Sequence, residues 1–266
     1  EHLVLATPDN GVATAIYAAC KATVKVGDGK EITLHEETNY PFEEGIAFTV
    51  STDEKVAFPF YLRIPSWTQK AEVRVNGKKV SAAPVAGKYL CINREWANGD
   101  RVELALPMSL SMRTWQVNKN SVSVDYGPLT LSLKIAEKYV EKDSRETAIG
   151  DSKWQKGADS KKWPTTEIYP DSPWNYSLVL DKKEPLKNFK VIRKSWPADN
   201  YPFTVASVPL EVKAIGRPVP EWKIDETGLC GVLPEEDAVK GDKEEITLIP
   251  MGAARLRISA FPNTKE

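Results

Sequence analysis

The chain has 266 residues, 41% of them hydrophobic and 27% charged, which is typical of a protein that folds around an apolar core. Its 36 basic and 37 acidic residues nearly cancel, so we expect no surface that follows nucleic-acid phosphates. Two histidines and three cysteines exclude most metal sites and nucleophilic triads. The longest apolar run, residues 12–20, is about half the length that a membrane span requires.

The first half of the sequence alternates apolar and polar residues with the period of a β-strand. Asn76 and Gly77 predict a tight hairpin, because an Asn-Gly pair readily adopts the positive φ angles of a type I′ turn. Further turns are expected at residues 27–29 and 98–100. The clearest alternating apolar positions are Phe60, Leu62 and Ile64, followed by Val102, Leu104 and Leu106.

The second half continues the same pattern after a polar, unpatterned stretch at residues 111–120, where we place a domain junction. Strands are expected at residues 122–124, 129–135, 210–213, 246–249 and 255–259. No window of 12 or more residues carries a helical stripe, so only helical turns are predicted, at residues 181–186.

Residues 141–176 show no alternation of apolar and polar residues, and this predicts a long polar loop. The same stretch contains three of the eight tryptophans. Large rings in such a loop either pack against the protein's own sheet or stack on the C–H face of a sugar. Under the second alternative, the candidate carbohydrate-binding residues are Trp154, Trp163, Tyr169, Trp174 and Tyr176.

These patterns predict an all-β chain of two consecutive antiparallel β-sandwich domains, immunoglobulin-like or jelly-roll-like, with little helix. The first domain is expected at residues 1–113. The second is expected at residues 114–266 and includes the loop at about 141–176.

A series of short motifs, in conserved order along the whole chain, resembles the region after the catalytic module of glycoside hydrolase family 127. The motifs in the first half are Ala6-Thr-Pro-Asp-Asn-Gly11, Glu37-Thr-Asn-Tyr-Pro-Phe42, Phe58-Pro-Phe-Tyr-Leu-Arg-Ile-Pro-Ser-Trp67, Val73-Arg-Val-Asn-Gly-Lys78, Arg94-Glu-Trp96 and Val102-Glu-Leu-Ala-Leu-Pro-Met108. Those in the second half are Gly127-Pro128-Leu129, Trp174-Asn-Tyr176, Val219-Pro-Glu-Trp222 and Thr247-Leu-Ile-Pro-Met-Gly-Ala-Ala-Arg-Leu-Arg257.

The resemblance implies a helical (α/α)6 barrel that hydrolyses L-arabinofuranosides, followed by two β-sandwich modules, of which this chain matches only the sandwiches. In that family a cysteine thiolate acts beside a zinc ion bound by cysteines and a glutamate, all in the barrel. Cys20, Cys91 and Cys230 do not match that arrangement, so no catalytic residue carries over and zinc is expected only in the missing module. We interpret the three cysteines as buried free thiols and expect the missing module immediately before Glu1.

The residues themselves offer little independent chemistry. Three acidic clusters occur, but the neighbours Glu36 and Glu37 would point to opposite faces of a strand and could not flank one glycosidic bond. His2 and His35 make poor bases for a serine hydrolase, and the spacing of Asp143, Asp151 and Asp159 matches no compact calcium loop. We predict no catalytic residue and no metal site. The remaining acidic clusters are Glu43-Glu44 and Glu235-Glu236-Asp237.

The preferred hypothesis is a non-catalytic pair of sandwiches that supports the helical catalytic domain of the same polypeptide, itself a hydrolase of L-arabinofuranosides or related plant glycans. It predicts an exposed apolar patch on the first domain. The alternative is a carbohydrate-binding module that stacks plant-type oligosaccharides on the aromatic residues, and a third reading is an adhesion module. By resemblance, the protein is expected in the periplasm or outside the cell.

Overall fold

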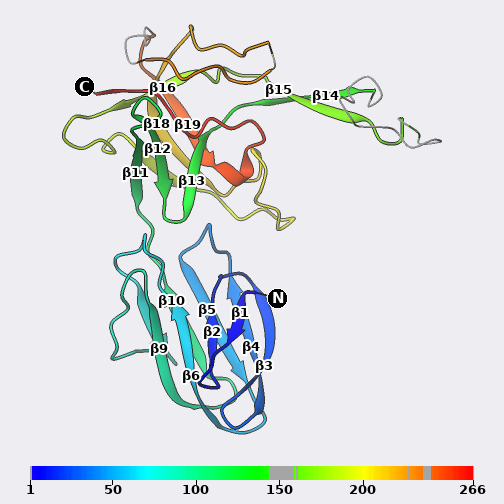
Figure 1. Ribbon diagram of the computed structural model, residues 1–266, viewed down its shortest axis with the longest axis vertical. Helices are drawn as coiled ribbons and strands as arrows, with labels where there is room; N and C mark the ends of the chain where they lie inside the picture. Colours follow the sequence, from blue (N-terminus) through cyan, green and yellow to red (C-terminus); the bar gives the residue numbers. More distant parts are fainter. Residues whose placement is uncertain (1, 144–158, 160, 227, 236–240, 266) are drawn as a thin grey trace. The chain divides into compact units, whose positions relative to one another are not determined.

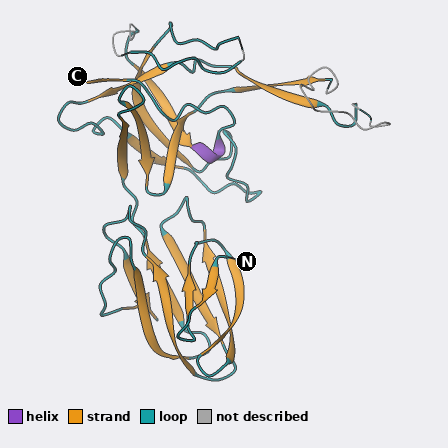
Figure 2. Ribbon diagram, viewed as in Figure 1, coloured by secondary structure: helices purple, strands orange, loops and turns teal. Residues whose placement is uncertain are grey.

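The structure is a computed structural model that describes residues 2–143, 159, 161–226, 228–235 and 241–265 (Figure 1). It is nearly all β, and its sheets are antiparallel except where β2 pairs with β6 and β16 with β20. Contacts divide the chain into two compact units. The first comprises Glu1–Leu110 with Tyr126–Leu129, and the second Ser111–Asp125 with Thr130–Glu266. The predicted all-β, sandwich-like fold is confirmed (Figure 2).

Two sheets form the first unit. The four-stranded sheet has the order β1-β2-β6-β9 and the six-stranded sheet has the order β3-β4-β5-β10-β7-β8. The strands are β1 Val4–Ala6, β2 Val12–Thr14, β3 Cys20–Val26, β4 Lys30–Thr38, β5 Gly45–Ser51, β6 Val56–Arg63, β7 Glu72–Val75, β8 Lys78–Lys79, β9 Tyr89–Trp96 and β10 Arg101–Ala105.

The predicted turns of this unit are confirmed. Asn76 and Gly77 have φ angles of 50° and 76° and join β7 to β8, with Val75 opposite Lys78. Gly27 and Gly29, also at positive φ, join β3 to β4. Each turn needs residues that tolerate the left-handed region, which glycine does without a steric penalty.

One continuous core lies between the two sheets. Phe48 from β5 meets Phe60 from β6 edge to face at 5.3 Å between ring centroids, and Phe60 in turn meets Trp96 from β9 at 5.9 Å. All three side chains are fully buried. Alternation along each strand sends every second residue into this space, as the sequence pattern predicts.

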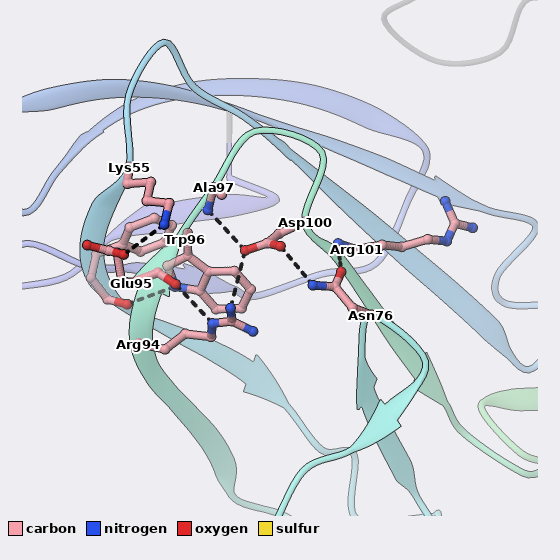
Figure 3. Close-up of polar contacts among 9 residues, drawn as sticks. Lys55, Asn76, Arg94, Glu95, Trp96, Ala97, Asp100 and Arg101 are labelled. Atoms are coloured by element: carbon pink, nitrogen blue, oxygen red, sulfur yellow. Dashed lines mark hydrogen bonds and ion pairs between the residues drawn. The ribbon is translucent and has the colours of Figure 1, made fainter.

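Asp100, in the turn between β9 and β10, ties three segments together (Figure 3). Its carboxylate accepts hydrogen bonds from the Asn76 side chain at 2.8 Å and the Ala97 N–H at 3.0 Å, and lies 3.5 Å from the Arg94 guanidinium. Asn76 also accepts the Arg101 N–H at 2.8 Å. Burial alone would raise the pKa of Asp100, but these donors and Arg94 together lower it below its ordinary value.

An eight-stranded sheet and a separate two-stranded sheet form the second unit. The larger sheet has the order β11-β12-β13-β19-β18-β16-β20, with β17 on β18, and β14 pairs with β15. The strands are β11 Leu110–Trp115, β12 Ser121–Tyr126, β13 Leu129–Leu133, β14 Glu137–Lys142, β15 Thr165–Pro170, β16 Tyr176–Leu180, β17 Lys190–Arg193, β18 Leu210–Pro218, β19 Glu244–Pro250 and β20 Asn263–Lys265.

Residues near the end of the sequence contact two strands of the larger sheet, β12 and β16. Phe261 exchanges two backbone hydrogen bonds with Val122 of β12, at 2.8 and 2.9 Å. The next residue, Pro262, accepts the Leu178 N–H, and β20 then runs parallel to β16. Residues 261–265 therefore link β12 to β16, and we call them the closing segment.

Several sequence expectations are wrong in this unit. Residues 165–170, expected within the loop 141–176, form β15, because Thr, Ile and Tyr favour an extended chain once β14 offers a paired edge. Residues 255–259 form no strand: the Ile258 carbonyl accepts the Leu133 N–H of β13 at 2.9 Å, but no strand ladder continues this bond along the segment. β11 begins at Leu110 and covers the first five residues of the stretch 111–120 expected to be unpatterned. Residues 181–186 make turns only, and the helical element of the described chain is a 3-10 turn, Met251–Ala253 (Figure 2).

Candidate functional site

The five aromatic residues predicted to bind sugar do not form one platform. Trp154 lies outside the described residues. Trp163 is 71% exposed just before β15, whereas Tyr176 is 8% exposed in β16, within the large sheet. Tyr176 is therefore a core residue, and burial, followed by a hydrogen bond with Glu244, raises its pKa to about 12. Of the four candidates that the structure describes, Tyr169 and Trp174 line the same pocket.

Tyr169 and Trp174 line a pocket of about 300 Å³ in the second unit. Four segments far apart in the sequence form it: Ile135 after β13, β15 with the following loop, residues 224–230, and residues 255–258. Its walls are largely apolar, and this is the usual character of a small-ligand site. The lining residues are Ile135, Ile168, Tyr169, Pro170, Trp174, Ile224, Gly228, Leu229, Cys230, Arg255, Leu256, Arg257 and Ile258.

Trp174 is held by the chain around it. Its ring meets the buried ring of Trp222 edge to face at 5.2 Å. The amide of the next residue, Asn175, donates to the carbonyls of Val219 at 2.9 Å and Trp222 at 3.1 Å. The Trp222 indole N–H donates to the Gly231 carbonyl at 3.0 Å. This network fixes the half-buried Trp174 at the pocket before any ligand arrives.

Arg255 and Arg257 are the charged residues of the pocket, and the sequence interpretation missed both by assigning them to a strand. Arg257 donates its Nε–H to the Ala254 carbonyl at 2.8 Å, while the backbone N–H of Arg255 donates to a Glu137 carboxylate oxygen at 2.8 Å. Within the described part of the chain, no carboxylate forms an ion pair with either guanidinium. Both side chains are exposed and retain N–H groups for a ligand.

A second surface of interest is the outer face of the four-stranded sheet in the first unit. The strand register places Leu5, Ala13, Tyr61 and Cys91 opposite one another across β1, β2, β6 and β9. We call these four residues the outer row. Beside it, Tyr89 is 49% exposed. The row is a continuous, mostly apolar strip on a face that the unit's own core leaves uncovered.

A shallow depression of about 540 Å³ lies along the outer row, lined by Thr7, Pro8, Asp9, Ala13, Tyr61 and Tyr89. The Tyr61 hydroxyl donates to Asp9 at 2.5 Å, and the Thr7 hydroxyl donates to the other oxygen of the same carboxylate. The hydrogen bond from Thr7, followed by that from Tyr61, lowers the pKa of Asp9. The bond from Tyr61 to Asp9 also raises the pKa of Tyr61. Asp9 therefore remains ionised and orients the Tyr61 ring on the sheet.

Glu36 and Glu37 point to opposite faces of β4, as the sequence predicts. The Glu37 side chain is 54% exposed and pairs with Arg101 at 3.2 Å. Glu36 is 1% exposed and accepts the Ala18 N–H at 3.0 Å and the Cys20 thiol at 3.8 Å. Burial raises the pKa of Glu36 to about 7, although both hydrogen bonds lower it.

The cysteines are free, but the prediction that they are buried is wrong. Cys20 is partly buried, and Cys91 and Cys230 are exposed. Cys91 lies between two inward-pointing residues of β9 and so must face outward. Of the three aspartates considered for calcium, Asp151 lies outside the described residues and Asp159 accepts the Lys161 N–H at 3.0 Å.

Among the described residues, no group of three His, Cys, Asp or Glu side chains is placed to hold a metal ion. In the same residues, no helix has both the length and the apolar character that crossing a membrane would require.

Residues 11–108 match the family model described as beta-L-arabinofuranosidase, GH127 middle domain. No curated protein matches the chain. Among solved structures, a GH127 beta-L-arabinofuranosidase from Geobacillus stearothermophilus T6 is similar with a TM-score of 0.61 at 21% identity, over 98% of this chain and 35% of that one.

Two further structures are similar with TM-scores of 0.60. One is described as a glycoside hydrolase, at 23% identity over 96% of this chain and 36% of that one. The other is the GH127 beta-arabinofuranosidase BT3674, at 22% identity over 97% of this chain and 36% of that one. The chain thus spans about a third of the length of these proteins and shares the fold of that part. It contains a region related to GH127, and the predicted resemblance is confirmed at this level.

Proposed function

We propose that the chain is the non-catalytic β-sandwich region of a GH127-like enzyme and supports a helical catalytic domain on the same polypeptide. The observation that carries this proposal is the match of residues 11–108 to a GH127 middle domain, within a chain that spans about a third of its structural neighbours. Hydrolysis of L-arabinofuranosides or related plant glycans, and any zinc ion that it needs, would belong to the helical domain. By the same resemblance, the protein would act in the periplasm or outside the cell.

The outer row supports this role in the first unit. Exposed apolar strips on a sheet commonly mark an interface, because they lose water when a partner covers them. The row lies on the sheet whose edge strand, β1, is the first strand of the chain. A domain that precedes the chain would therefore enter beside this face, and the Asp9 carboxylate at its margin would remain at the solvated rim.

The test is the activity and stability of the polypeptide that the complete gene encodes. We expect it to contain a helical domain and to release arabinose from β-L-arabinofuranosides. In that protein, Tyr89→Lys should lower the melting temperature of the helical domain, while the control Val85→Lys, at another exposed apolar position, should not. A complete gene product that ends at these two units would refute the proposal.

The pocket of Tyr169 and Trp174 favours a second function, carbohydrate binding by the second unit. A half-buried indole, held by Trp222 and accompanied by a tyrosine ring, is suited to stacking on the apolar face of a sugar. Titration with arabinan oligosaccharides should produce heat and a fluorescence change, and Trp174→Ala should abolish both. The same heat from the Trp174→Ala protein would refute binding at this pocket.

A further inference from the structure

The pocket of the second unit combines an apolar wall with two cationic side chains at one side. Trp174 and Tyr169 come from β15 and the loop after it, whereas Arg255 and Arg257 come from the segment after the 3-10 turn. Arginine presents a planar fork of N–H donors that matches the geometry of a carboxylate. A site that only stacks neutral sugars on aromatic rings does not need such a fork.

The two arginines are partly oriented without a ligand. Arg257 is fixed at Nε by the Ala254 carbonyl, and this leaves the N–H groups of its terminal nitrogens for another acceptor. The backbone of Arg255 is anchored on Glu137. Orientation before binding lowers the entropy that a ligand must overcome.

Acidic side chains near the pocket are already engaged. Glu137 accepts from the Arg255 backbone and from the Tyr139 hydroxyl at 2.6 Å, and Glu167 accepts the Tyr169 hydroxyl. Asp225 accepts the Leu229 N–H at 3.1 Å. None of these three carboxylates lines the pocket, so the ionisable groups among the lining residues are the two arginines, the Cys230 thiol and the Tyr169 phenol.

We propose that this pocket binds a carboxylated sugar, a uronic acid residue of an oligosaccharide, with its ring on Trp174 and its carboxylate on Arg255 and Arg257. A volume of about 300 Å³ is at the lower end for small-ligand sites and suits one or two sugar rings. This assignment rests on the second function proposed above and specifies its ligand class.

The experiment compares trigalacturonate with its fully methyl-esterified form by isothermal titration calorimetry at about 150 mM salt, where long-range charge effects are screened. The ester keeps the rings and removes the charge. We expect the acid to bind at least about tenfold more tightly than the ester, a difference of about 1.4 kcal/mol. Arg257→Gln should remove most of that preference, because it removes a charged partner of the carboxylate. Arg193→Gln, which removes the same charge from β17 outside the pocket, is the matched control.

The outcomes separate the two proposals. Equal binding of acid and ester, abolished by Trp174→Ala, would overturn the uronate assignment and leave sugar binding intact. Absence of binding by either ligand and by neutral arabinotriose at millimolar concentration would overturn both. A loss of acid binding that is as large in Arg193→Gln as in Arg257→Gln would show attraction to overall charge and would overturn the assignment as well. Retained circular dichroism spectra and melting temperatures establish that each variant is folded.

Discussion

Glu36 makes the stability of the first unit depend on pH in a direction that few carboxylates produce. Its carboxyl group is buried, and its pKa rises from 4.5 to about 7 because burial disfavours the charged form. A carboxyl with a raised pKa is more protonated in the folded state. The contribution of Glu36 to the stability of the folded state is therefore fully present below about pH 4.5 and is lost as the pH rises through about 7.

The size of the effect follows from the two pKa values. Each tenfold change in the acid constant is worth about 1.36 kcal/mol, so ionising Glu36 in the folded protein costs about 3 kcal/mol. Between pH 5 and pH 8 this penalty grows from about 1 to about 3 kcal/mol. Glu36→Gln cannot ionise and keeps an oxygen for the Ala18 N–H. Any free-energy cost of placing the neutral glutamine amide at this buried position does not depend on pH.

The assay is urea unfolding at pH 5, 6, 7 and 8, read by hydrogen-exchange mass spectrometry of peptides from β3 and β4. The free energy of unfolding of Glu36→Gln, relative to wild type, should rise by about 2 kcal/mol from pH 5 to pH 8. Glu31→Gln, at an exposed position of the same strand, should show no such trend. A difference between Glu36→Gln and wild type that is constant with pH would refute the reasoning.

Other substitutions test the turns and close contacts of the first unit and one core residue of the second. Asp100→Ala should lower the free energy of unfolding by about 1–3 kcal/mol at pH 7, because two donors and Arg94 lose their acceptor. Since the folded pKa of Asp100 is lowered, this loss should shrink as the pH falls below about 4, and acid titration followed by circular dichroism measures it. Gly11→Ala should lower the melting temperature, with a cost of at least about 1–3 kcal/mol, because a Cβ there would lie 2.3 Å from the Pro59 carbonyl oxygen. Gly45→Ala, with no atom within 4 Å of the added carbon, should melt close to wild type. Trp222→Ala should lower the melting temperature of the second unit by removing about 3–5 kcal/mol, and an unchanged value would contradict its core role.

Local patterns predicted those parts of the fold that depend on local chemistry. Asn76-Gly77 specifies its own turn, and the alternation through Phe60 and Leu104 identifies which side chains face the core. The segment at 255–259 alternates equally well but forms no strand, because alternation predicts which side chains face a core and not whether the backbone bond from Leu133 to Ile258 continues into a ladder. The sequence pattern did not predict β15, because its strand-forming residues lie within a polar stretch that shows no alternation.

The candidate sites were less predictable because they depend on contacts between distant segments. Enrichment in aromatic residues drew attention to Tyr169 and Trp174, and these two residues line one pocket. The same reasoning included Tyr176, since composition cannot separate a buried ring of β16 from an exposed one. Arg255 and Arg257 gave no signal as pocket residues, because only the folded chain brings them beside Trp174.

The closing segment at residues 261–265 has a consequence for handling this protein. If those five residues were removed, Val122 of β12 would lose its backbone partner Phe261, and β16, without β20, would become an unpaired edge of the sheet. Open edges recruit strands from other molecules, so a truncated protein is expected to form aggregates whose growth depends on concentration. A short deletion at the end of the chain would thus change its colloidal behaviour more than a deletion of equal length in an exposed loop.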